Sequence, residues 1–90
     1  MIKQAHVLIT GKVVGVGFRF WVKSQANILN LAGWVKNNND KVEAVFQGEE
    51  KLIKAMLLLI KNGPPLSAVK DIVVQWNKPE EDFNWFEIIR

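Results

Sequence analysis

Apolar and polar residues alternate along five stretches of this chain, the pattern of β-strands with one buried face. In the first stretch, residues 4–10, Ala5, Val7 and Ile9 fall on one side. Residues 38–40 are turn formers between the second and third stretches, which are therefore expected to form a β-hairpin. The remaining predicted strands are residues 33–37, 41–47, 69–76 and 83–89.

Two further stretches repeat their apolar residues every three or four positions, the spacing of one face of an α-helix. In residues 18–29 this stripe is formed by Phe18, Val22, Ala26 and Leu29. Asn30 is expected to end the first helix, because asparagine tolerates the left-handed conformation at a helix end. Residues 49–61 form the second stripe, and the Asn-Gly-Pro-Pro sequence of residues 62–65 ends it.

These elements follow one another in the order β-α-β-β-α-β-β. This order predicts an α+β fold of the ferredoxin-like, split βαβ type, with a mostly antiparallel sheet, two helices on one face and an extra C-terminal strand. No linker or repeat interrupts the chain, so residues 1–90 are expected to form a single domain. Because this fold carries many activities, function has to be argued from residues.

The amino-acid composition excludes several kinds of functional site. The chain has 90 residues, 49% of them hydrophobic, which is sufficient for one compact core. With no cysteine it has no disulfide, no thiolate metal site and no cysteine nucleophile, and we expect a cytoplasmic protein. The apolar run near the N-terminus is too short for a signal peptide or a membrane span, so no membrane association is expected.

Charge is unevenly distributed along the chain. Lysine and arginine number 12 against 9 acids, a net charge of +3, well below the dense basic stripe typical of nucleic-acid binding. No acid precedes Asp40, whereas five basic residues do: Lys3, Lys12, Arg19, Lys23 and Lys36. The first half of the chain is therefore expected to attract anions and not to bind nucleic acid.

The sequence GKVVGVGFR, residues 11–19, joins the first strand to the first helix and has the composition of an anion site. Successive N–H groups of a glycine-rich turn converge on an anion, a helix N-terminus adds its own N–H groups, and arginine pairs two phosphate oxygens. The segment lacks both the GK[ST] ending of nucleoside-triphosphate loops and the third glycine of dinucleotide loops. A phosphate or carboxylate ligand is therefore expected.

GKVVGVGFR, then LAGWVKN, VEAVFQG and NGPPLSAV occur in an order and at spacings that resemble the acylphosphatase family over nearly the whole chain. The resemblance implies an enzyme that hydrolyses the carboxyl-phosphate bond of small acyl phosphates with no metal or cofactor. It implies that Arg19 and the loop amides bind phosphate and that Asn37 orients the attacking water. The implied loop residues are Val13, Val14, Gly15, Val16, Gly17, Phe18 and Arg19.

The chain departs from the family pattern at three positions. The family usually has glutamine at the position of Val14, threonine at that of Asn38 and glycine at that of Lys41. Valine removes a polar contact from the loop, although a cradle made of backbone groups should still bind phosphate. Without the glycine, one of residues 38–40 is expected to take the positive φ of the hairpin turn.

Two other functions fit parts of the sequence. One is an acylphosphatase-like module that binds phosphoanions or regulates, with weak turnover, suggested by Val14. The other is a ferredoxin-like RNA binder, but residues 42–47 offer only Phe46 where such proteins carry several aromatics. His6 has no second histidine or cysteine as a co-ligand, so it is assigned no role and no metal is expected. The enzyme is ranked first and is expected to be a monomer.

Overall fold

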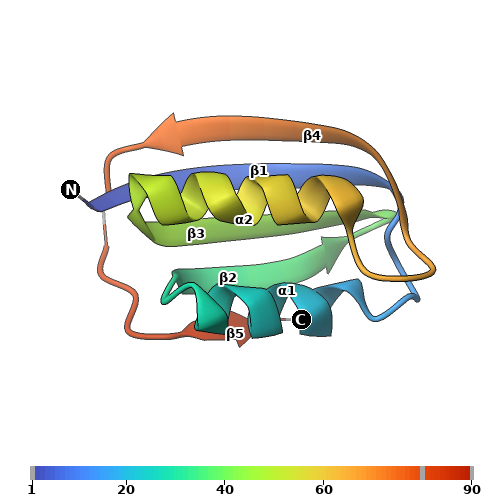
Figure 1. Ribbon diagram of the computed structural model, residues 1–90, viewed down its shortest axis with the longest axis horizontal. Coiled ribbons are helices and arrows are strands. Elements are labelled where there is room, and N and C mark those ends of the chain that lie inside the picture. Colours follow the sequence, from blue (N-terminus) through green and yellow to red (C-terminus); the bar gives the residue numbers. More distant parts are fainter. Residues whose placement is uncertain (1, 80, 90) are drawn as a thin grey trace.

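The computed structural model describes residues 2–79 and 81–89 and contains the seven elements in the predicted order (Figure 1). The strands are β1 (Ile2–Lys12), β2 (Ala32–Asn38), β3 (Lys41–Glu49), β4 (Ala68–Asn77) and β5 (Phe86–Ile88). The helices are α1 (Phe18–Ile28) and α2 (Glu50–Asn62). Both helices lie within one residue of the ranges that their apolar periodicity predicts.

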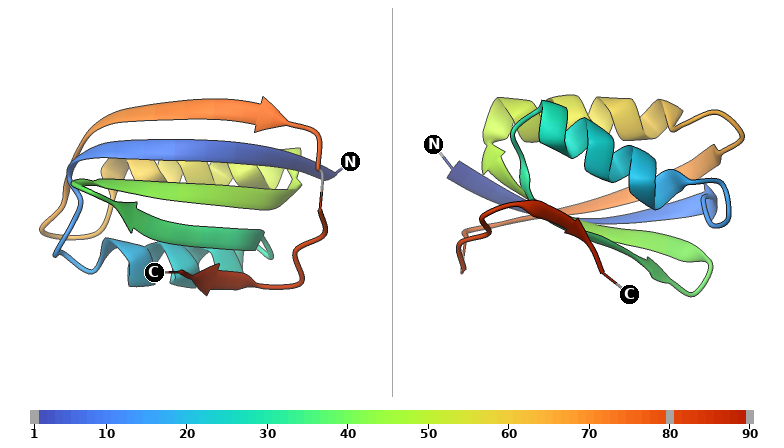
Figure 2. Two further views of the ribbon diagram at one scale, coloured as in Figure 1. Left: turned by 180° about the vertical axis from the view of Figure 1, so that it is seen from behind. Right: turned by 90° about the horizontal axis from the view of Figure 1, so that it is seen from below.

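The strands form one sheet in the order β4-β1-β3-β2-β5. β1 pairs antiparallel with β3 and β4, and β2 pairs antiparallel with β3, whereas β5 runs parallel to β2. Both helices cover the same face of the sheet and leave the other face open (Figure 2). The predicted α+β, ferredoxin-like arrangement with an extra C-terminal strand is therefore confirmed.

The core lies between the helices and the covered face of the sheet. Strand alternation supplies it with Ala5, Val7 and Ile9 from β1, each fully buried, as predicted. Burying such side chains is the main stabilising term, about 1.5–3 kcal/mol for each large aliphatic or aromatic one. The helices and remaining strands contribute Phe18, Val22, Ala26, Val35, Val42, Ala44, Phe46, Ile53, Met56, Ile60 and Phe86.

Two asparagines take the left-handed conformation. Asn30 has φ 55° just after α1, and Asn39 has φ 59° in the turn between β2 and β3. Positive φ costs asparagine less free energy than it costs most other non-glycine residues, because its short polar side chain hydrogen-bonds to the local backbone. The helix stop and the glycine-free hairpin turn expected from the sequence are confirmed.

The C-terminal strand is shorter than predicted, because a buried side chain forms hydrogen bonds with the main chain of the residues before it. Gln47, 7% exposed, accepts a hydrogen bond from the Phe83 N–H at 3.1 Å and donates one to the Glu81 carbonyl at 2.6 Å. These bonds fix the segment that connects β4, at one edge of the sheet, to β5, at the opposite edge. The strand predicted from residue 83 therefore begins at Phe86; Glu80, in the predicted turn, lies outside the described residues.

Candidate active site

The loop and Asn37 lie at the same end of the sheet. β1 and β2 are both antiparallel to β3, which lies between them, so they run in the same direction and end together (Figure 1). Ile9 of β1 and Asn37 of β2 both pair with Val42, which puts their Cα atoms roughly 10 Å apart across two strand spacings. The loop to α1 follows directly after β1.

Gly11 and Lys12, counted with the loop in the sequence, belong to β1, which continues past a bulge after Thr10. The loop proper is residues 13–17. Its Val13 is 1% exposed and Val16 packs against the core, so these two valines anchor the loop. Val14, 40% exposed, points away from the core.

Gly15 and Gly17 shape the loop with φ 79° and 75°. A Cβ at either position would meet no atom within 4 Å, so these glycines are required by conformation and not by packing. Positive φ costs a residue with a side chain roughly 1–2 kcal/mol. The glycine spacing in the sequence therefore encodes the path of the backbone.

Gly17→Ala is expected to lower the free energy of unfolding by about 1–2 kcal/mol, because alanine has to adopt the left-handed conformation. Gly17→Asn is the matched control, since asparagine tolerates this conformation and should cost less. Urea denaturation measures both changes. A Gly17→Ala protein as stable as the parent would show that the loop does not hold this conformation.

The main-chain N–H groups of residues 14–20 have no hydrogen-bond acceptor among the described residues. The nearest bonded N–H groups lie on either side of this segment: the Val13 N–H donates to the Gly11 carbonyl at 3.1 Å, and the Trp21 N–H donates to the Gly17 carbonyl at 3.1 Å as the first helical bond. No side chain caps α1, and its first turn contains no acid. A row of unpaired N–H groups at a helix N-terminus is a site for an anion.

Arg19 is the second residue of α1 and is half-buried. Its neighbour Phe18 is 1% exposed and contacts the ring of Trp21 edge-on at 5.6 Å, which fixes the first turn on the core. Arg19 has no ion pair with an acid of the described chain, and a cation at a helix N-terminus is disfavoured by the dipole. An anion bound by the loop would satisfy both the guanidinium and the N–H groups.

Asn37 shares the helix-covered side of the sheet with the loop. Side chains alternate along β2, so Asn37 lies on the same face as Val35, which is fully buried, and opposite Val42, also fully buried. It is half-buried near the end of the strand, where the core gives way to solvent. An amide at this place can donate one hydrogen bond and accept another.

The structure thus brings Arg19, Asn37 and the loop residues to one end of the molecule. Val13 departs from the expected set in one respect, because its N–H is bonded to Gly11 and only its side chain serves the loop. The part of the chain that the structure describes contains no group of three His, Cys, Asp or Glu side chains able to hold a metal ion. Nor does it contain a helix with the length and hydropathy to span a membrane.

The chain matches the sequence model of the family described as Acylphosphatase over residues 5–88. It is 42% identical to an acylphosphatase of Nostoc, over 97% of this chain and 86% of that one, and 39% identical to the acylphosphatase of Bacillus subtilis, over 96% of each. The crystal structure of acylphosphatase from Bacillus subtilis superposes with a TM-score of 0.95 over both whole chains, at 38% identity.

These similarities cover the glycine loop, the hairpin and both helices together, and they agree with the anion-receptive end of the sheet. The resemblance stated from the motifs and the fold class are confirmed. The chain belongs to the acylphosphatase family and is an acyl-phosphate hydrolase.

Proposed function

We propose that the N–H groups of the loop and the Arg19 guanidinium bind the phosphate of an acyl phosphate while Asn37 orients the attacking water. The observation that carries this proposal is the row of N–H groups in residues 14–20 with no acceptor in the described chain, next to an arginine without an acidic partner there. Phosphoryl transfer is catalysed mainly by positioning and by neutralising the equatorial oxygens, which these groups supply.

The leaving group explains why few side chains are needed. A carboxylate has a pKa near ~4, so it departs at neutral pH without a general acid. The water oxygen forms the new bond to phosphorus, the bond from phosphorus to the acyl oxygen breaks, and a phosphate oxygen takes the water proton. The products are a free carboxylate and inorganic phosphate, and no metal or cofactor enters any step.

Hydrolysis of benzoyl phosphate by the purified protein in the presence of excess chelator tests the proposal. We expect full turnover, because every group assigned to the reaction belongs to the chain. Loss of activity that added divalent metal restores would contradict the metal-free mechanism. Stabilisation by inorganic phosphate without hydrolysis would instead support the phosphoanion-binding module.

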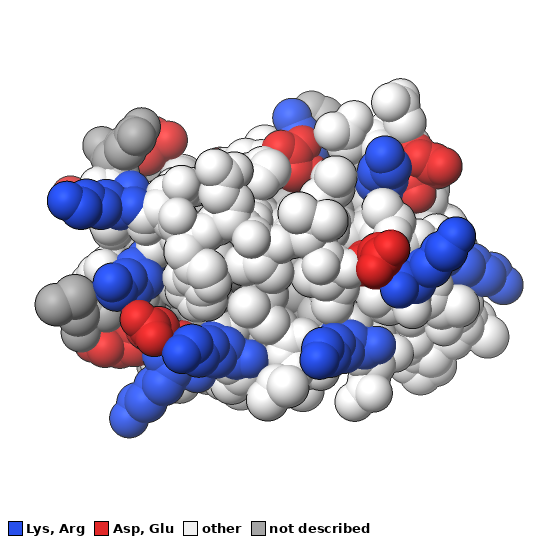
Figure 3. Space-filling view, turned by 90° about the horizontal axis from the view of Figure 1, so that it is seen from above, with Lys and Arg blue, Asp and Glu red and all other residues white. Residues whose placement is uncertain are grey.

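The proposal includes a single domain over residues 1–90 that acts in the cytoplasm as a monomer, without a nucleic-acid or membrane partner. The absence of cysteine is compatible with a reducing compartment. Seen from the β4 edge, lysine and arginine side chains lie around an uncharged middle and next to acids, and form no continuous basic stripe on this face (Figure 3). Sedimentation equilibrium tests the monomeric state, and an RNA-binding assay at low salt tests the absence of a nucleic-acid partner.

A further inference from the structure

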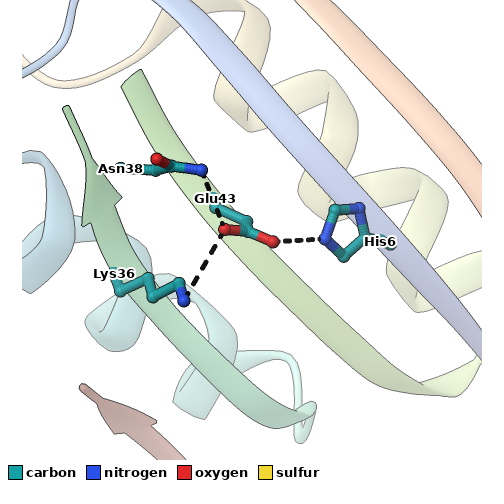
Figure 4. Close-up of polar contacts among 4 residues, drawn as sticks. All are labelled: His6, Lys36, Asn38 and Glu43. Carbon is teal, nitrogen blue, oxygen red and sulfur yellow. Dashed lines mark hydrogen bonds and ion pairs between the residues drawn. The ribbon is translucent and has the colours of Figure 1, made fainter. Parts of the chain in front are cut away.

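Glu43 lies on the open face of the sheet and receives contacts from two neighbouring strands (Figure 4). Its Oε2 lies 2.6 Å from His6 Nε2 of β1, and its Oε1 accepts a hydrogen bond from Asn38 Nδ2 of β2 at 3.3 Å. Lys36 Nζ of β2 lies 3.9 Å from the same Oε1. The Glu43 side chain is only 17% exposed, so solvent screens these contacts less than it would on an open surface.

Two of these partners flank Asn37 in the chain. Because side chains alternate along β2, Lys36 and Asn38 project to the open face while Asn37 projects to the helix-covered face. Glu43 therefore holds the residue before Asn37 and the residue after it. It constrains the backbone of Asn37 from the side opposite to the reaction.

Among the described residues, the end of β2 that carries Asn37 has backbone hydrogen bonds on one side only. β5 pairs with β2 at residues 33–35, and just after it the last described bond on this side runs from the Ile89 N–H to the Val35 carbonyl at 2.9 Å. At Asn37 the described ladder continues with β3 alone. A strand edge next to a turn is prone to local opening, so side-chain contacts there have more influence on geometry than they have in the middle of the sheet.

The same carboxylate connects the hairpin to the strand that leads into the phosphate loop. His6 belongs to β1, and its ring also meets Trp34 of β2 edge-on at 6.4 Å. Lys36 Nζ lies 5.4 Å from the centre of the Trp34 ring, so His6, Glu43, Lys36 and Trp34 form a closed circuit in which each residue contacts the next. The circuit ties β1, which carries the loop, to β2, which carries Asn37.

We propose that Glu43 is a positioning residue for hydrolysis, which sets the place of Asn37 relative to the phosphate loop and touches neither substrate nor water. This inference rests on the role proposed for Asn37. It assigns a function to His6 and Asn38 as well, since they are the hydrogen-bonding partners through which Glu43 acts.

Kinetics of Glu43→Ala with benzoyl phosphate test the proposal. We expect kcat to fall about 10-fold, because small displacements of an orienting group cost up to about 100-fold. The inhibition constant of inorganic phosphate should not change, since the loop amides and Arg19 remain in place. Glu43→Gln should recover most of kcat, because its amide oxygen can accept from Asn38 and its amide nitrogen keeps a polar group within reach of the His6 ring.

Asp71→Ala is the matched control, because Asp71 is an exposed acid opposite Thr10 on β4 and has no contact with the hairpin among the described residues. It should leave both constants unchanged. An active Glu43→Ala protein with unchanged kcat would overturn the proposal, and so would an equal loss of kcat and phosphate affinity, which indicates general loosening. If Glu43→Ala does not fold, Asn38→Ala should still lower kcat alone, and an unchanged kcat there overturns the proposal.

Asn37→Ala separates this inference from the proposed function. If Asn37→Ala is fully active, the role of Asn37 is wrong and the inference falls with it. If Asn37→Ala is inactive while Glu43→Ala keeps full kcat, only the role of Glu43 is wrong.

Discussion

Arg19→Ala should lower kcat/KM for benzoyl phosphate by at least about 1,000-fold, the range found when an arginine that neutralises a transferring phosphoryl group is lost. The guanidinium has no acidic partner in the described chain and stands beside unpaired N–H groups, so its charge is available to the substrate. The guanidinium pairs the phosphate oxygens in the bound substrate and neutralises their charge more strongly in the transition state, so both binding and kcat should fall. Steady-state kinetics measure the two effects separately.

Lys23→Ala is the matched control for Arg19→Ala. Lys23 is an exposed cation one helical turn further along α1, so its removal changes net charge equally without reaching the loop. It should retain nearly full activity. Inorganic phosphate should raise the Tm of the parent and of Lys23→Ala but not of Arg19→Ala, because a ligand stabilises only the folded state that binds it. Full activity in Arg19→Ala would contradict its role.

Asn37→Ala should lower kcat by about 100-fold or more, because a water that is no longer oriented reaches the in-line position rarely. Its effect on phosphate affinity should be small, since the binding groups lie in the loop and α1. The ratio of the two effects is the diagnostic quantity: kcat falls while the inhibition constant of phosphate stays constant. Benzoyl phosphate turnover, with phosphate as competitive inhibitor, measures both.

Asn27→Ala controls for the loss of an asparagine amide. Asn27 is exposed near the C-terminal end of α1, away from the loop at the helix start. We expect its kinetics to match those of the parent. A loss of phosphate affinity in Asn37→Ala as large as its loss of kcat would place Asn37 in the phosphate cradle instead of beside the water.

The strand boundary missed in the sequence has a clear cause. Alternation in residues 83–89 predicts one continuous strand, and alternation depends only on local spacing. In the structure, Gln47 of β3 uses its amide to bind the Phe83 N–H and the Glu81 carbonyl. A contact between residues so far apart in the chain leaves no periodic signal.

The contact of His6 with Glu43 has no signal in the sequence, for a related reason. As the sole histidine in a chain without cysteine it has no metal-ligand pattern, so the sequence assigns it no role. The register of β1 on β3 places its ring beside Glu43. Register follows from which strands pair, and one-dimensional spacing does not specify a diagonal neighbour on another strand.

The sequence by itself determined the order of elements, the left-handed helix end at Asn30 and a positive-φ turn within residues 38–40, and it predicts an anion site in the glycine loop with Arg19. Each of these follows from properties of neighbouring residues: periodicity, backbone φ preference and the charge at a helix start. Only the tertiary structure decided that the N–H groups of residues 14–20 find no acceptor in the described chain, that Asn37 lies at the same end of the sheet as the loop, and that Glu43 contacts both β1 and β2. These depend on strand pairing, in which long-range hydrogen bonds select one arrangement among many that local preferences allow.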